Sequence, residues 1–223
     1  MASKLDNSLK ASDLRSFFSS YHEEDNGVIE GTYQLYRIVD ETVYYGSFYM
    51  KIDCNHLIPE IYLPNNMNEM KKEGFNHFYR EGNCCLGTNL DILLKWGNKR
   101  NAVDFFDNIV DAYLVNYLSF KETGKPLFGE YGHRGLKDYY CELFNTDKDR
   151  LCTIIRRVNH ILRLKKVSDS EMCLCSPNRK FNNCDCTGKR AVMIMLKDKS
   201  IEKAFLDETR SFKCQTDRKY RKK

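Results

Sequence analysis

The sequence of 223 residues lacks long apolar runs, and this absence excludes membrane-spanning proteins. No window approaches the roughly 20 consecutive apolar residues that a spanning helix needs. The start of the chain, MASKLDNSLKASDLRS, also lacks the apolar core of a secretory signal. We therefore expect a cytoplasmic protein without membrane association. Hydrophobic residues make up 42% and charged residues 30% of the chain, which is typical of a folded globular protein.

The sequence also lacks a glycine-rich nucleotide-binding loop, although it contains 12 glycines. Such loops cradle phosphate groups with backbone N–H groups, so their absence argues against ATP-driven activation within this chain. Internal repeats and low-complexity tracts are likewise not visible. Any chemistry that requires ATP would then depend on a separate protein.

Cysteine, by contrast, is abundant, with ten residues. A reducing compartment keeps thiols free, so these cysteines are not expected to form a disulfide framework. They are expected to be buried, metal-bound or catalytic. Cys54, Cys141, Cys152 and Cys214 stand apart from any motif and are interpreted as core or surface thiols. The pair Cys54 and His56 is a weak metal signal.

Charge is distributed unevenly along the chain. Residues 1–150 hold 17 Lys and Arg against 23 Asp and Glu, a net charge of −6, whereas residues 151–223 hold 19 against 8, a net charge of +11. This change of sign predicts a main domain over 1–150 and a basic module over 151–223. A basic module suits an acidic partner, including nucleic acid, although a well-solvated surface explains it equally well.

The first half of the sequence alternates between strand and helix patterns. Ser12 can cap a short amphipathic helix that the glycine stop EEDNG at 23–27 ends. Its apolar residues at helical spacing are Leu14, Phe17, Phe18 and Tyr21. The Tyr-, Val- and Ile-rich runs at 31–39 and 42–52, separated by Asp-Glu, predict an antiparallel hairpin. In the second run one face is expected to be buried: Tyr44, Phe48, Met50 and Ile52.

Further along, prolines bracket residues 59–64, which suits an edge strand, and a polar loop follows at 65–74. Asn101 begins a helix that ends at Gly124. Two more apolar stripes predict helices beyond residue 134. The stripes consist of Leu136, Tyr139, Tyr140 and Leu143, and of Leu151, Ile154, Ile155, Val158 and Ile161.

Four cysteines gather in the basic module, in the stretch CLCSPNRKFNNCDC at 173–186. Two Cys-x-Cys pairs at this spacing suit one tetrahedral, structural Zn²⁺ held by Cys173, Cys175, Cys184 and Cys186. The stretch resembles the SEC-C zinc motif, in which Cys-Pro-Cys-Gly-Ser-Gly precedes Lys, an aromatic residue and further Cys ligands. Lys180 and Phe181 match the motif, whereas Ser176-Pro177-Asn178 replaces Gly-Ser-Gly and Cys186 comes one place late. The resemblance implies a small recognition module.

A second motif, NHFYREGNCCLGT at 76–88, follows the predicted strands. Its order resembles the ubiquitin-conjugating enzymes, in which strands and a proline-rich turn precede His-Pro-Asn and Gly-x-[Ile/Val]-Cys-Leu. His77 would match the family histidine, Gly82 the glycine and Cys85 the active-site cysteine, and Cys84 replaces an aliphatic residue. The resemblance covers about residues 10–145. Together with the SEC-C-like tail it looks most like bacterial proteins of antiphage immune operons.

This resemblance implies an α+β fold: a ubiquitin-conjugating-like antiparallel sheet with flanking helices, followed by a small zinc-binding C-terminal module. It also implies a transferase in which Cys85 carries a protein C-terminal carboxyl as a thioester and passes it to an amine. The carried protein would be a ubiquitin-like protein or an immune nucleotidyltransferase, and a separate activating enzyme would supply the activated carboxyl.

The family asparagine is missing after His77, so another donor would have to stabilise the oxyanion. Asn83, Tyr79 or a backbone N–H are the candidates. His133, on a predicted loop, is a second candidate base or orienter beside His77, although both histidines can equally be structural. If Thr88 or Asn89 caps a helix, its N-terminus would favour the Cys85 thiolate.

Two other interpretations of these residues stay open. In the first, the same fold is a non-catalytic scaffold, and the basic zinc tail binds a protein or nucleic acid. In the second, Cys85 and His133 serve a cysteine peptidase, although a clear orienting Asn or Asp motif is missing.

Overall fold

The computed structural model describes residues 9–24, 26–127, 135–176, 178–210 and 212. The chain forms two compact units, Met1–Glu130 and Tyr131–Lys223. This boundary lies earlier than the predicted one at residue 150, which would cut through helix α7 (Lys148–Leu164). The charge difference is unchanged, because the first unit holds 13 Lys and Arg against 19 Asp and Glu (−6) and the second holds 23 against 12 (+11).

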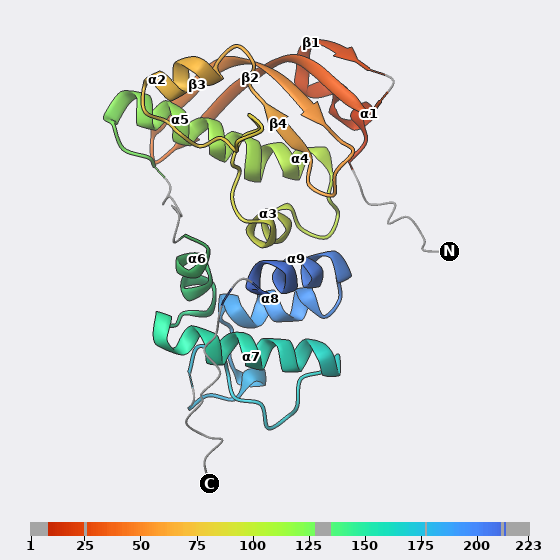
Figure 1. Cartoon of the computed structure of the whole chain (residues 1–223), viewed down its shortest axis with the longest axis vertical. Coiled ribbons are helices and arrows are strands. Elements are labelled where there is room, and N and C mark those ends of the chain that lie inside the picture. The colour runs from red at the N-terminus through yellow and green to blue at the C-terminus, as the bar shows by residue number, and fades with distance from the viewer. Residues whose placement is uncertain (1–8, 25, 128–134, 177, 211, 213–223) are drawn as a thin grey trace. The chain divides into compact units, whose positions relative to one another are not determined.

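The first unit is built on an antiparallel sheet with strand order β1-β2-β3-β4 (Figure 1). The strands are β1 (Phe18–Glu23), β2 (Val28–Val39), β3 (Thr42–Asp53) and β4 (Glu60–Tyr62). The predicted hairpin is confirmed as β2 and β3, which pair along their whole length. Asp40 and Glu41 connect them with φ of 46° and 67°, the left-handed values that a two-residue hairpin turn requires.

One face of the sheet forms the core of the first unit. The four β3 side chains predicted to be buried are between 0% and 7% exposed, which confirms that prediction. Tyr33 of β2 lies with its ring 4.8 Å from that of Phe106, and Phe48 of β3 lies 6.4 Å from Tyr117. The helical segment that contains Phe106 and Tyr117 therefore packs on this face.

That segment begins and ends where the sequence predicts. The Asn101 side chain accepts a hydrogen bond from the Asp104 N–H at 2.8 Å, and Gly124 ends the helix at a φ of 69°. In between are α4 (Ala102–Phe105), a π-helical turn η2 (Phe106–Val110) and α5 (Asp111–Thr123). The π turn is not visible in the apolar spacing.

Two local predictions are wrong in the first unit. The expected helix to Tyr21 is only α1 (Ala11–Leu14) and a 3₁₀ turn η1 (Arg15–Phe17), because the chain then pairs with β2 as strand β1. Leu14 and Phe18 are both buried. Residues four apart share one face of a helix and one face of a strand alike, so their spacing does not distinguish the two. The expected polar loop contains α2 (Met67–Lys72), which buries Met70 completely.

The second unit contains four α-helices among its described residues. They are α6 (Gly135–Phe144), α7, α8 (Thr187–Met195) and α9 (Lys199–Arg210), with a 3₁₀ turn η3 (Phe181–Asn183). The predicted helices α6 and α7 are confirmed, and the predicted α7 stripe is buried. Helices α8 and α9 were not predicted. The unit's core brings together side chains from all four helices: Tyr140, Phe144, Val158, Val192 and Phe205.

The coarse prediction is therefore confirmed: the protein combines an antiparallel sheet with flanking helices and a cluster of four cysteines.

Candidate functional site

The motif at 76–88 folds into a short hairpin that brings His77 and Cys85 together. Phe78 and Cys84 form an antiparallel bridge, and the Cys85 N–H donates to the His77 carbonyl at 2.9 Å. Neighbouring residues of such a ladder point to opposite faces. Cys85 and His77 therefore share one face of the hairpin, and Cys84 and Phe78 share the other.

The turn of the hairpin depends on Gly82. The Tyr79 N–H donates to the Asn83 carbonyl at 2.8 Å, and the Gly82 N–H donates to the Tyr79 carbonyl at 3.1 Å. Gly82 adopts a φ of 92°, in a region that disfavours side chains. The glycine before the two cysteines is thus required by the turn that places Cys85 opposite His77.

The two adjacent cysteines differ in exposure. Cys84 is 3% exposed, its N–H donates to the Ile61 carbonyl at 2.7 Å, and burial raises the pKa of its thiol to about 12. Cys85 is only partly buried. A thiol becomes a nucleophile as its thiolate, so a buried thiol with a raised pKa is inert. Cys84 is a buried neighbour, as expected, and Cys85 is the accessible thiol of the pair.

Helix α5 contacts the hairpin through Tyr113. The Tyr113 hydroxyl donates to the His77 carbonyl at 2.9 Å, so this oxygen accepts from both Tyr113 and Cys85. The ring of His77 lies 4.7 Å from that of Phe75, which is 1% exposed. Burial raises the pKa of Tyr113, so its hydroxyl stays a donor. These contacts fix the backbone beside Cys85.

A helix begins four residues after Cys85. Thr88 caps α3 (Asn89–Trp96), its hydroxyl accepting from the Asp91 N–H at 3.1 Å. The sequence predicts that Thr88 or Asn89 caps a helix after Cys85, and Thr88 is that cap. The Asp91 carboxylate lies near Gly87, where an added Cβ would meet it at 3.5 Å. Asp91 was not predicted from the sequence to lie in this segment's cap, although Thr88-x-x-Asp91 is a capping pattern that could have identified it.

The sequence also singles out Asn83, Tyr79, His133 and His56. The side-chain oxygen of Asn83, two residues before Cys85 in the sequence, is buried and makes no hydrogen bond. The Tyr79 hydroxyl lies 3.5 Å from the Gly87 carbonyl, across the cysteine segment. His133 lies outside the described residues. His56 is 53% exposed beside the carboxylates of Asp53 and Glu60.

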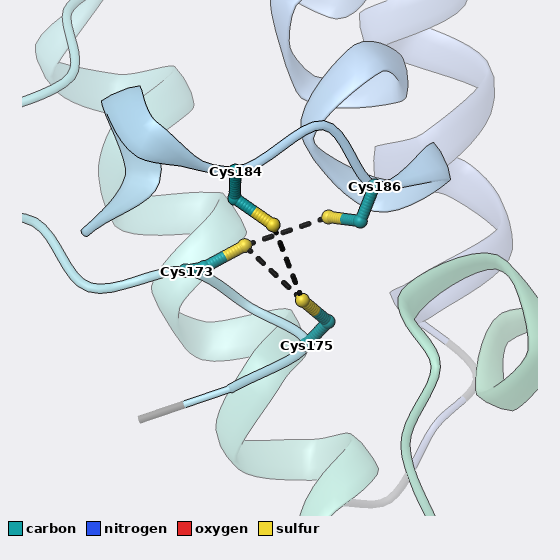
Figure 2. A group of neighbouring side chains, drawn as sticks. All are labelled: Cys173, Cys175, Cys184 and Cys186. Atoms are coloured by element: carbon teal, nitrogen blue, oxygen red, sulfur yellow. Dashed lines mark hydrogen bonds between the residues drawn. The ribbon is translucent and has the colours of Figure 1, made fainter. Parts of the chain in front are cut away.

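The second cluster consists of the four cysteines of the basic unit (Figure 2). Their sulfurs converge: Cys173 lies 3.4 Å from both Cys175 and Cys186, and Cys175 lies 3.5 Å from Cys184. All four lie within 4.8 Å of one another. Zn–S bonds of about 2.3 Å in a tetrahedron separate sulfurs by about 3.8 Å. The cluster therefore fits one tetrahedral metal ion, consistent with zinc.

Local structure positions both Cys-x-Cys pairs. The Cys173 N–H donates to the Arg179 carbonyl at 2.6 Å, closing the loop between the pairs. Cys186 is the N-cap of α8, and its sulfur accepts from the Lys189 N–H at 3.4 Å. The late position of Cys186 is thus compatible with the cluster, because the helix start turns its side chain toward the other sulfurs.

Arg157 attaches this loop to α7. Its guanidinium donates to the carboxylate of Glu171 and to the carbonyls of Met172 and Cys173. Nothing in the spacing of the motif marks Arg157, because it lies on a different element. Burial raises the pKa of Cys173, and hydrogen bonding from Cys173 lowers that of Cys184. Four protein ligands would leave no open position for a substrate, so the cluster suits a structural ion.

Among the described residues, three further cysteines belong to neither cluster: Cys54, Cys141 and Cys152. Burial raises the pKa of Cys54 to about 12 and also raises the pKa of Cys141. Cys152 is disulfide-bonded, so the expectation of a thiol is wrong there. Cys214 lies outside the described residues.

Comparison with family models, curated proteins and solved structures finds no significant match. Among the described residues, no helix has both the length and the apolar character needed to cross a membrane.

Proposed function

We propose that this chain is a ubiquitin-conjugating-like transferase with its nucleophile at Cys85. It would carry the C-terminal carboxyl group of a protein as a thioester and transfer it to an amine, in bacterial antiphage immunity. The observation that carries the proposal is the pairing of an accessible Cys85 with His77 on one face of a hairpin, while Cys84 is buried on the other. The order of sheet, hairpin and helix along the chain supports it.

The proposed reaction has two steps, acylation of Cys85 and transfer of the acyl group to an amine. The Cys85 thiolate attacks the carbonyl carbon of an activated carboxyl group, and the leaving group departs with its electron pair as the C–S bond forms. An amine then attacks the thioester, the C–N bond forms, and the C–S bond breaks to return the thiolate. The amine proton passes to a base. A separate activating enzyme would supply the activated carboxyl group.

Several groups can serve this chemistry. His77, beside Cys85, is the candidate base or orienter. The first residue of α3, Asn89, comes four residues after Cys85, and the helix dipole would favour the thiolate. Asn83, through its side-chain N–H groups, and Tyr79 stay the candidate donors that the sequence suggests for the oxyanion that forms in each step. Zinc at Cys173, Cys175, Cys184 and Cys186 would stabilise the second unit without taking part in the reaction.

A mass measurement tests the transferase. Protein isolated from its native host at mildly acidic pH without reductant should carry a protein-sized adduct that a thiol reagent removes. Cys85→Ser should retain the adduct as a more stable ester, Cys85→Ala should lose it, and Cys84→Ala should keep it. Equal adducts in both alanine variants would contradict the proposal. Hydrolysis of the adduct without any transfer to an amine would favour a peptidase.

The charge of the two units favours a second candidate, a binding module that uses the same fold without catalysis. The second unit has a net charge of +11 and would attract the phosphate groups of a nucleic acid. The affinity of such binding falls steeply as the salt concentration rises. Under this alternative, a nucleic acid or acidic protein would bind Cys85→Ala as tightly as the unchanged protein. Removal of the basic unit would abolish binding. A steep salt dependence would indicate nucleic acid rather than a protein partner.

A further inference from the structure

Arg157 of α7 contacts the segment that carries the first two cysteines of the metal cluster, Cys173 and Cys175 (Figure 2). Its Nε donates to the Glu171 carboxylate at 3.2 Å, and its Nη2 donates to the same carboxylate and to the Met172 carbonyl. Its Nη1 lies 3.5 Å from the Cys173 carbonyl. All three nitrogens of one guanidinium therefore face three consecutive residues, and the last of these is a candidate metal ligand.

The segment is held at its other edge by the second half of the loop. The Cys173 N–H donates to the Arg179 carbonyl at 2.6 Å, and the Glu171 carbonyl accepts from the Phe181 N–H at 2.8 Å. In such an antiparallel ladder, the residue between two bonded positions turns its own carbonyl to the opposite edge. Met172 is that residue, and its carbonyl accepts from the guanidinium there. Both edges of the segment are thus hydrogen-bonded.

Apolar burial holds the same loop on the helices. Leu174, which lies between the two cysteines of the first pair, is 0% exposed, and Phe181 is 1% exposed. The hydrophobic effect has no preferred direction, whereas a hydrogen bond depends on the angle between its donor and its acceptor. Arg157 therefore adds a directional contact to the burial, and this contact fixes the orientation of the backbone beside Cys173.

The charge of Arg157 also suits a metal bound by cysteines. Four thiolates around one divalent ion leave a net charge of about −2, and a guanidinium stays protonated throughout the physiological pH range. The Arg157 side chain is 30% exposed, so solvent screens its charge only in part. The Glu171 carboxylate offsets some of that charge. We therefore expect the position of the guanidinium to matter more than its charge.

We infer that Arg157 is a positioning residue that sets the affinity of the four-cysteine cluster for its metal ion. It holds the backbone of Met172 and Cys173 in the orientation seen in the cluster, so the ion does not have to order this segment itself. Residues that orient metal ligands typically change metal affinity about 10–100-fold when they are replaced. This inference rests on the metal cluster and is independent of the chemistry of Cys85.

Competition between the full-length protein and a chromophoric zinc chelator tests the role of Arg157. Arg157→Gln removes both the charge and the fork of donors, and should weaken zinc binding about 10–100-fold. Arg157→Lys keeps the charge but lacks the planar fork that reaches all three acceptors, and should still weaken zinc binding, by about tenfold. The control is Arg163→Gln, an exposed arginine of the same helix that lies beside His160, and it should bind zinc as the unchanged protein does.

Two further measurements separate positioning from the loss of a ligand and from general instability. With Co²⁺ as the probe, Arg157→Gln should reach the same absorption spectrum as the unchanged protein, because four thiolates still bind, but at a higher Co²⁺ concentration. Ile155→Val creates a cavity in the buried stripe of α7. It should lower the midpoint of thermal unfolding and leave the zinc affinity unchanged.

Several results would overturn the inference. Unchanged zinc affinity in Arg157→Gln would do so even if that variant unfolds at a lower temperature. Full affinity in Arg157→Lys would mean that charge rather than position matters. An equal loss in Arg163→Gln or Ile155→Val would show that the affinity follows net charge or stability. If the unchanged protein bound neither Zn²⁺ nor Co²⁺, the inference would fail, while the adduct measurement on Cys85 would stay unaffected.

Discussion

At the scale of single residues, the first unit buries a charged group where its sheet meets its helices. Asp111, 2% exposed, accepts a hydrogen bond from the Tyr33 hydroxyl at 2.5 Å and pairs with Arg37. The π turn comes immediately before Asp111. Burial raises the pKa of Asp111, while Tyr33 and Arg37 act against that rise. A buried carboxylate thus depends on two partners from strand β2.

Tyr33→Phe should therefore destabilise the protein by about 1–3 kcal/mol near pH 7, because the buried carboxylate loses a donor. Since the folded pKa of Asp111 lies above its unfolded value, its contribution to stability is greatest below the unfolded pKa and falls as pH rises through the folded pKa. Losing Tyr33 raises the folded pKa further. Urea unfolding should accordingly show a smaller loss at pH 4 than at pH 7.

The matched control for that measurement is Tyr36→Phe, which removes a hydroxyl from the same strand at a position that is 64% exposed. It should change stability by less than about 0.5 kcal/mol at either pH. An equal loss in both variants would show that the Asp111 contact contributes nothing specific.

At the scale of elements, sequence patterns succeed where one face of a strand or helix is uniformly buried. The β2–β3 hairpin has both an alternating face and a two-residue turn, so its position and partner were predictable. The region at 12–23 fails because Leu14 and Phe18 suit either a helix or a strand, and only pairing with β2 decides. The pairing of His77 with Cys85 was hidden for a similar reason, since it depends on the register of a hairpin.

Helix α8 packs closely on α6, a contact that the spacing of apolar residues in the sequence does not reveal. Gly188 lies against α6, where an added Cβ would meet the Phe144 ring at 2.8 Å and the Leu143 carbonyl at 3.2 Å. The Thr187 hydroxyl also donates to that carbonyl at 2.9 Å. The close approach of α8 to α6 thus requires glycine at this position, although nothing in the neighbouring sequence marks it.

Gly188→Val should therefore destabilise the second unit by about 1–3 kcal/mol through overpacking against Phe144. The effect should appear as a lower midpoint of thermal unfolding. Arg190→Val places the same side chain on the exposed side of α8 and serves as the control, with little expected change. A similar midpoint in both variants would mean that the two helices separate without cost.

At the scale of the whole molecule, the two units differ in what holds them together. The first unit has a sheet and an apolar core, whereas the described part of the second unit joins four helices to a loop that brings four cysteine sulfurs together. The cysteine spacing made this cluster predictable from the sequence. The attachment of the loop to α7 through Arg157 was not predictable, because it joins distant parts of the chain.

Metal removal should consequently affect the two units unequally. A chelator that extracts the ion leaves four thiols at close range and frees the start of α8, so the second unit should lose helical structure while the first unit retains its fold. Elemental analysis should find one zinc per chain. Limited proteolysis after chelation should then cut within 131–223 well before it cuts the sheet.

The variant Cys175→Ser with Cys184→Ser should reproduce the effect without chelator, whereas Cys141→Ser, outside the cluster, should keep both the metal and the protease resistance. Because the ion has no open position, chelation should leave the reactivity of the Cys85 thiol toward an alkylating reagent unchanged. A loss of that reactivity together with the metal would mean that the two units depend on each other for folding. Retained protease resistance of 131–223 without metal would show that helix packing alone suffices.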